Sequence, residues 1–140
     1  MAAHTFTKGS ITSASAAQMI RAAEAKAAQI GVPMVIAVTD ESGVLKAFSR
    51  MDGAPLLSVD LAKDKAYTAA AYGIATHAWH DFIKSDPPLL HGIVKTPRLI
   101  VFGGGYPIEV EGAVVGAIGV SGGHYEQDME VAKAGLSALS

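Results

Sequence analysis

A glycine-rich stretch from Gly103 to Gly123 constrains the fold of this chain more than any other part of the sequence. It places strand-forming residues between glycines, which allow sharp turns and close approach of the main chain. We expect strands at Pro107–Val110 and Ala113–Val120, joined by a tight turn at Glu111-Gly112. Because glycines also let a ligand come close to the backbone, this stretch is the first candidate for the wall of a small-molecule site.

The rest of the chain is divided by helical periodicity and by turn residues. The expected helices run from a cap at Ser13 or Ser15 to Gly31, from Pro55 or Leu56 to about Tyr72, from the cap Thr76 to Lys84, and from about Tyr125 to Ala138. The other expected strands are Met34–Thr39, Val44–Ser49 and Leu99–Phe102, and the Asp86-Pro87-Pro88 run stops the third helix. The order α-β-β-α-α-β-β-β-α predicts an α+β sandwich with antiparallel strand pairs, not a doubly wound parallel sheet.

Composition narrows the class of protein. The 140 residues, half of them apolar and 17% charged, fit one domain spanning residues 1–140 with its own hydrophobic core. The net charge of −2 and the lack of a basic run argue against a nucleic-acid partner. The chain has no cysteine, which excludes disulfides, thiol catalysis and thiolate metal sites.

The chain also lacks obvious targeting signals. Its first residues, MAAHTFTKGS, do not form a signal peptide, and its apolar stretches are too short for a membrane span. We therefore expect a cytoplasmic protein with no membrane partner. The surplus of apolar residues hints at a buried interface between subunits, and so at a homo-oligomer.

Lys65 is the most unusual charged residue. On a helix it shares a largely apolar face with Leu61, Thr68 and Tyr72, so the lysine either snorkels to water or is held in a site or an interface. Since lysine is seldom buried without a partner, it is a candidate ligand-binding or catalytic residue.

Two further charged residues lie close together where the predicted hairpin ends. Arg50 and Asp52 lie at the strand exit just before Gly53. The arginine fits bidentate binding of a ligand carboxylate, although an ion pair with Asp52 or with a neighbouring subunit explains it equally well.

The glycine clusters offer main-chain donors. The N–H groups of Gly103, Gly104 and Gly105 fit an oxyanion or a carboxylate. Ser121-Gly122-Gly123 precedes a helix start, where N–H groups and the helix dipole favour anions. The alternative is that both clusters are only turns.

The histidines suggest two kinds of chemistry. His77 and His80 are three residues apart and fit two metal ligands on one helical face, and a single histidine suits a haem iron. His124 begins the last helix beside the glycines, where the dipole favours neutral imidazole, so His124 and Glu126 fit an acid/base pair. Capping and helix stabilisation are the structural alternatives.

Three segments together resemble a known family: VTDESGVLKAFSRMDGA, LAKDKAYTAA and FGGGYPIEVEGAVVGAIGVSGGHYEQDMEVAKAGL. They resemble the haem-degrading, HbpS/GlcG-like family, which includes the C-terminal domain of PduO-type cobalamin adenosyltransferases. The resemblance runs from about Ser13 to Leu139. It implies a profilin-like or PAS-like fold, with a five-stranded antiparallel sheet flanked by helices, and it implies homo-oligomers. Haem is the cofactor that some members bind.

The residues that match the family pattern are Arg50, Asp52, Lys65, Gly103, Gly104, Pro107 and the segment Gly119–Gly122. His124 departs from the pattern, because a small hydroxyl residue usually follows the second glycine of SGG. An imidazole there fits a haem ligand or a catalytic acid/base.

The sequence thus predicts an oligomeric haem-binding protein, with Arg50 or Lys65 meeting a propionate. The alternative is a hydratase, isomerase or lyase acting on a small carboxylate, with His124 and Glu126 moving protons. In a third interpretation the glycine-rich surface packs only against another subunit.

Overall fold

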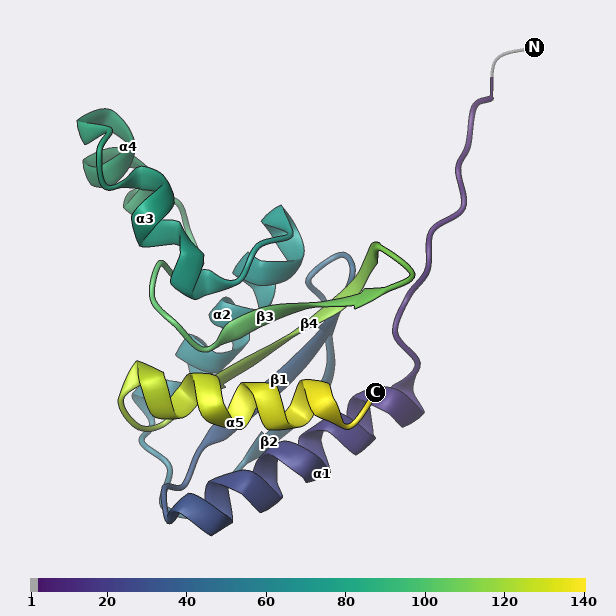
Figure 1. Ribbon diagram of the computed structural model, residues 1–140, viewed down its shortest axis with the longest axis vertical. Coiled ribbons are helices and arrows are strands. Elements are labelled where there is room, and N and C mark those ends of the chain that lie inside the picture. The colour runs from purple at the N-terminus through teal and green to yellow at the C-terminus, as the bar shows by residue number, and fades with distance from the viewer. Residues whose placement is uncertain (1–2) are drawn as a thin grey trace.

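The computed structural model describes residues 3–140. Its helices are α1 (Ser13–Ile30), α2 (Leu57–Tyr72), η1 (Thr76–Ala78), α3 (Trp79–Ile83), α4 (Pro87–Gly92), η2 (Ile93–Lys95) and α5 (Tyr125–Ser137), where η marks a 3-10 turn. Its strands are β1 (Val35–Asp40), β2 (Leu45–Arg50), β3 (Gly105–Val110) and β4 (Ala113–Ser121). Residues 3–10 form an extended segment that leads to α1, and α3 and α4 project at one end (Figure 1).

The four strands form one antiparallel sheet in the order β2-β1-β4-β3. The α+β class is confirmed, but the prediction of five strands is wrong, because Leu99–Phe102 is not a strand. A side chain of α2 satisfies the main chain there: Ile100 N donates to Thr68 Oγ1 at 3.0 Å. The residue before this segment, Arg98, has a φ of 68°, which turns the chain out of an extended path.

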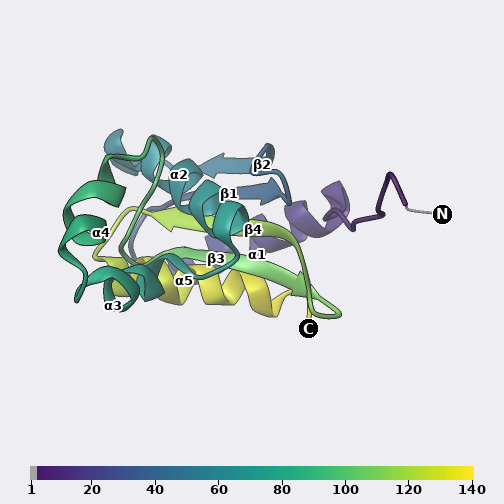
Figure 2. The ribbon, with the colours of Figure 1, turned by 90° about the horizontal axis from the view of Figure 1, so that it is seen from above.

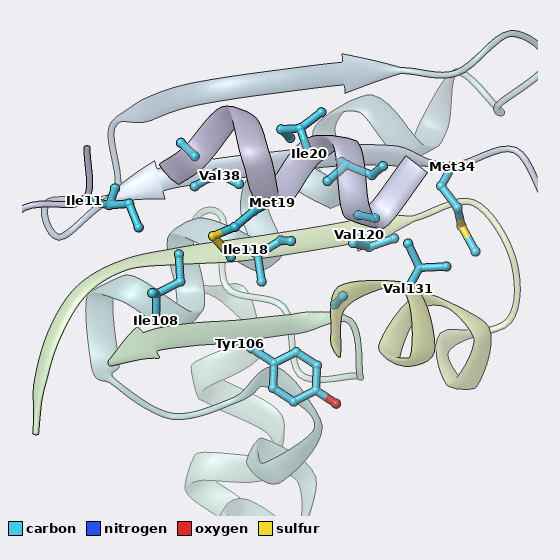
Figure 3. Packing of buried hydrophobic residues seen from close by; sticks show 14 of the residues in the cluster. Ile11, Met19, Ile20, Met34, Val38, Tyr106, Ile108, Ile118, Val120 and Val131 are labelled. Carbon is cyan, nitrogen blue, oxygen red and sulfur yellow. The ribbon is translucent and has the colours of Figure 1, made fainter. Parts of the chain in front are cut away.

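Helices cover both faces of the sheet. Figure 2 shows α1 and α5 on one face and α2 on the other. The larger core lies under α1 and α5, where Met19 and Val131 pack on the strand residues Ile118 and Val120 (Figure 3). Burial of this apolar face is the main stabilising contribution. None of the helices described between residues 3 and 140 is long and apolar enough to cross a bilayer.

The second core, under α2, is made of small residues. Ala62, Ala66 and Ala69 lie on the sheet, and Gly105 pairs with Gly119 directly beneath the helix. A Cβ on Gly119 would collide with the main chain of α2 at Ala62 and Ala66. The central glycines of the Gly103–Gly123 stretch therefore bring α2 into close contact with the sheet.

Two helix starts differ from the sequence prediction. The N-cap of α1 is Thr12, whose side chain accepts a hydrogen bond from Ser15 N, rather than Ser13 or Ser15. Thr76 lies inside η1 and is not a cap, because its Oγ1 accepts a hydrogen bond from Gly105 N at 2.9 Å. Asp86-Pro87-Pro88 does follow the end of α3, but it also starts α4, since proline suits the first turn of a helix.

Candidate ligand site above a buried ion pair

Lys65 forms an ion pair inside the protein. Helix α2 turns its side chain toward the sheet, and the side chain is 0% exposed. Its Nζ donates to Asp128 Oδ2 at 2.8 Å and to the carbonyl oxygen of Val120 at 2.9 Å. The lysine thus joins α2 to the end of β4 and to the first turn of α5.

Asp128 completes this arrangement from the other side. Its second carboxylate oxygen accepts a hydrogen bond from Gly123 N at 3.0 Å. Burial lowers the pKa of Lys65 and raises the pKa of Asp128, and in each case the attraction of the opposite charge opposes the shift. Because both side chains are buried and hydrogen-bonded to each other, removing either one leaves an uncompensated charge.

Gly104 makes room for the lysine. It has a φ of 127°, and a Cβ there would lie 2.7 Å from Lys65 Nζ and 2.6 Å from the oxygen of Val120. A Cβ on Gly103 would meet the side chain of Met129. These two glycines therefore accommodate side chains of the protein itself, while Gly105 donates its N–H to Thr76.

The start of α5 is occupied by the protein's own side chains. His124 is its N-cap, and its Nδ1 accepts a hydrogen bond from Glu126 N at 3.2 Å. Gln127 Oε1 accepts a hydrogen bond from His124 N at 3.1 Å. His124 therefore contacts the main chain of Glu126. The carboxylate of Asp128 accepts the Gly123 N–H that the sequence suggests as a donor to a ligand anion.

A pocket opens beside this ion pair. The ring of Phe102 lies over Lys65, with 5.1 Å between its centroid and Nζ. Phe102 also lines a cavity of about 330 Å³, which we call the Phe102 pocket. Its lining residues are His77, His80, Asp81, Val101, Phe102, Gly103 and Tyr125.

Three of the site residues predicted from the sequence line the Phe102 pocket: His77, His80 and Gly103. His124 lies at its margin, since its ring is 4.1 Å from that of Tyr125 between centroids. Lys65 lies beneath the wall of the pocket and not inside it.

Arg50 and Asp52 are elsewhere. They line a separate cavity of about 370 Å³ with Met51 and Gly53, at the end of β2. Since β2 and β3 are the opposite edges of the sheet, these two residues do not join the Phe102 pocket.

Within residues 3–140, no three side chains of the types His, Cys, Asp and Glu come close enough together to hold a metal ion. His77 or His80 would therefore suit a metal ion whose other ligands come from a bound cofactor, better than a metal ion held by protein side chains alone.

Sequence reasoning missed three residues of this region: Asp128, Phe102 and Tyr125. Asp128 is not among the site residues predicted from the sequence. A lysine on an apolar helix face does signal a buried carboxylate, but nothing in the sequence says which of the acidic residues lies near it. Phe102 lies in the segment predicted as a strand, and no sequence signal marks it as a pocket residue.

Comparisons with known proteins agree with this architecture. The sequence model of the family described as haem degrading protein HbpS-like matches residues 11–137. A 15.0 kDa protein of Citrobacter freundii from the dhaT-dhaS intergenic region is 42% identical over 93% of this chain and 92% of its own length. The protein GlcG of Escherichia coli is 33% identical over 82% of this chain and 84% of its own length.

The corrinoid adenosyltransferase PduO of Salmonella typhimurium is 37% identical over 88% of this chain, which spans 37% of that longer protein. Among solved structures, a PduOC:haem complex superposes with a TM-score of 0.85 at 36% identity, covering 92% of this chain and 94% of its own. The crystal structure of HbpS superposes with a TM-score of 0.89 at 28% identity, covering 100% and 99%.

The fold is that of the HbpS-like class of α+β proteins, with its antiparallel sheet between helices. The chain belongs to the HbpS-like family of haem-degrading proteins, related to GlcG and to the C-terminal domain of PduO.

Proposed function

We propose that this protein binds haem in the Phe102 pocket and does so as a homo-oligomer. The observation that carries the proposal is the composition of that pocket, in which two imidazoles, His77 and His80, lie with the aromatic rings of Phe102 and Tyr125. The haem complex of the related PduO domain supports the same ligand.

The residues present fit the chemistry of haem. An imidazole nitrogen is a common axial ligand of haem iron, and the macrocycle supplies the four equatorial nitrogens, so one histidine suffices. Aromatic rings offer flat apolar surface for the macrocycle. When bound, the haem would supply the redox and oxygen chemistry of its iron.

The buried pair would support the pocket from below. Lys65 holds the ring of Phe102 by a cation–π contact, and Asp128 ties Lys65 to the α5 turn that carries Tyr125. Arg50, the propionate partner suggested by the sequence, lines a different cavity. Arg50 would therefore not hold a propionate of a haem bound in the Phe102 pocket.

Exposed apolar side chains support the oligomeric part of the proposal. Leu56 and Leu57 at the start of α2 are 76% and 74% exposed, and Tyr72 at its end is 58% exposed. Large exposed apolar side chains are a feature of surfaces that form subunit contacts. Light scattering coupled to size exclusion tests this point: we expect an oligomer, and a monomer at micromolar concentration contradicts it.

The haem proposal is tested by titrating the apoprotein with haemin and recording the Soret band. We expect a saturating, stoichiometric band, which is weakened or shifted in His77→Ala or in His80→Ala, depending on which imidazole ligates the iron. His91→Ala is the matched control, because His91 is an exposed histidine on α4 outside the pocket. Identical spectra for all three variants would contradict the assignment of the pocket.

The small-carboxylate enzyme stays a prediction from the sequence. It needs an imidazole free to exchange protons, whereas His124 accepts a hydrogen bond at Nδ1 as a helix cap. We therefore do not extend the proposal to an acid/base reaction at this residue.

A further inference from the structure

We propose a second ligand site, for a small monocarboxylate with an apolar body, between the β1–β2 turn and α2. A cavity of about 520 Å³ lies there, and its lining shares no residue with that of the Phe102 pocket. We call it the Arg98 pocket. Its volume is typical of cavities that hold small organic ligands.

The cationic end of the pocket is held in place before any ligand arrives. The Nε of Arg98 donates to Asp64 Oδ1 at 2.9 Å, and the guanidinium carbon lies 3.9 Å from the ring centroid of Tyr67. The terminal nitrogens of a guanidinium so fixed suit a carboxylate, which they can bind bidentately. Lys63 also lines the pocket, and its Nζ lies 3.8 Å from Asp60 Oδ1, so this second cation is paired with a lining carboxylate, as Arg98 is paired with Asp64.

A buried hydroxyl also lines the pocket. Thr39 lines the pocket although it is only 1% exposed. Its Oγ1 has no hydrogen-bond partner in the part of the chain that the structure describes. Buried hydroxyl groups nearly always have a partner, so an oxygen of a ligand would satisfy this one.

Part of the pocket wall is apolar. Val44 and Leu45 are 61% and 46% exposed and line the pocket together with Tyr67. A bare inorganic anion would leave this wall in water, whereas the apolar body of a carboxylate would cover it.

The backbone around the pocket is adapted to this arrangement. Arg98 adopts a φ of 68°, which is costly for a residue with a side chain, and Thr68 Oγ1 donates to its carbonyl oxygen at 2.9 Å. On the other side, a Cβ on Gly43 would lie 2.7 Å from the ring of Tyr67, so the turn packs on that ring. The ring of Tyr67 therefore contacts both Arg98 and the β1–β2 turn.

Ligand-observed fluorine NMR with 4-fluorobenzoate tests the site on the full chain. We expect saturable binding that is about tenfold weaker, or more, for the uncharged 4-fluorobenzamide and for Arg98→Gln, since each removes a charge-assisted hydrogen bond. Thr39→Val, which keeps the shape of the side chain but removes the hydroxyl, should also weaken binding. Inorganic phosphate should compete only at much higher concentration.

Lys26→Gln serves as the matched control, because Lys26 pairs with Glu130 away from both pockets. It should bind the probe like the unmodified protein, and so should His77→Ala. Loss of haemin binding in His77→Ala would concern only the proposed haem site and not the Arg98 pocket. Equal affinity for benzoate and benzamide, or unchanged binding in both Thr39→Val and Arg98→Gln, would overturn the proposal. If Arg98→Gln does not fold, Thr39→Val decides alone.

Discussion

Single residues explain much of what is unusual in this sequence. A lysine on an apolar helix face, a glycine run and an acidic first turn look like three separate features in the sequence. In the structure they meet in one contact, because Lys65 Nζ reaches Asp128 over a main chain that only glycine at position 104 permits.

The buried pair yields a stability prediction. Lys65→Met or Asp128→Leu alone should lower the free energy of unfolding by about 3–5 kcal/mol, because each leaves one buried charge without its partner. The double variant should recover most of this loss. Chemical denaturation of the four proteins measures the coupling, and strictly additive losses would contradict the role of the pair.

The same pair predicts a pH dependence. Burial raises the folded-state pKa of Asp128 above its usual value of 3.8, so its contribution to stability falls as the pH rises through the window just above that value. Burial lowers the folded-state pKa of Lys65 below 10.5, so its contribution rises with pH through the window just below that value. The free energy of unfolding of the unmodified protein, relative to that of the double variant, should therefore be lowest at pH values between the two windows. Denaturation across this pH range measures the difference, and a maximum near neutrality would contradict the stated directions.

His124 gives a prediction that separates capping from catalysis. Loss of the cap in His124→Ala should destabilise the protein by about 0.5–2 kcal/mol, whereas His124→Asn, which can still cap, should lose much less. Thermal denaturation of both variants measures this. Equal destabilisation by asparagine and alanine would mean that the ring itself carries the effect.

At the scale of elements, local sequence signals predicted most helices and strands, and contacts across the fold decided the rest. Gly31 ends α1 as predicted and Gly73 ends α2 just after the predicted Tyr72, because left-handed glycines stop helices through local geometry. The predicted strand Leu99–Phe102 failed because the Thr68 side chain, distant in sequence, takes its hydrogen bond.

The same distinction applies to the candidate site. His77, His80 and Gly103 were found from spacing and composition, and they do line one pocket. The proximity of Asp128 to Lys65 depends on how α5 is placed against β4, which no local pattern encodes.

The close contact of α2 with the sheet predicts a sensitive glycine. Gly119→Ala should destabilise by about 1–3 kcal/mol or more, since its Cβ would collide with the main chain of α2 at Ala62 and Ala66. Gly92→Ala is the control, because a Cβ there meets nothing within 4 Å and the backbone has an ordinary negative φ. Urea denaturation compares the two, and equal stability would show that α2 can move away at no cost.

On the scale of the whole molecule, the two faces of the sheet pack against different kinds of side chain. The face under α1 and α5 holds the large apolar side chains, and the face under α2 holds small residues. The buried ion pair joins α2 to α5 at the end of β4. The projecting segment with α3 then lies beside the loop that carries Phe102, and the proposed haem pocket forms where they meet.

The most direct test of this account is the Soret spectrum of a double variant. The account predicts that His77→Ala/His80→Ala, folded by circular dichroism, loses the stoichiometric haemin band that His91→Ala retains. A double variant lacking both pocket histidines that still binds haemin with the spectrum and affinity of the unmodified protein would contradict it.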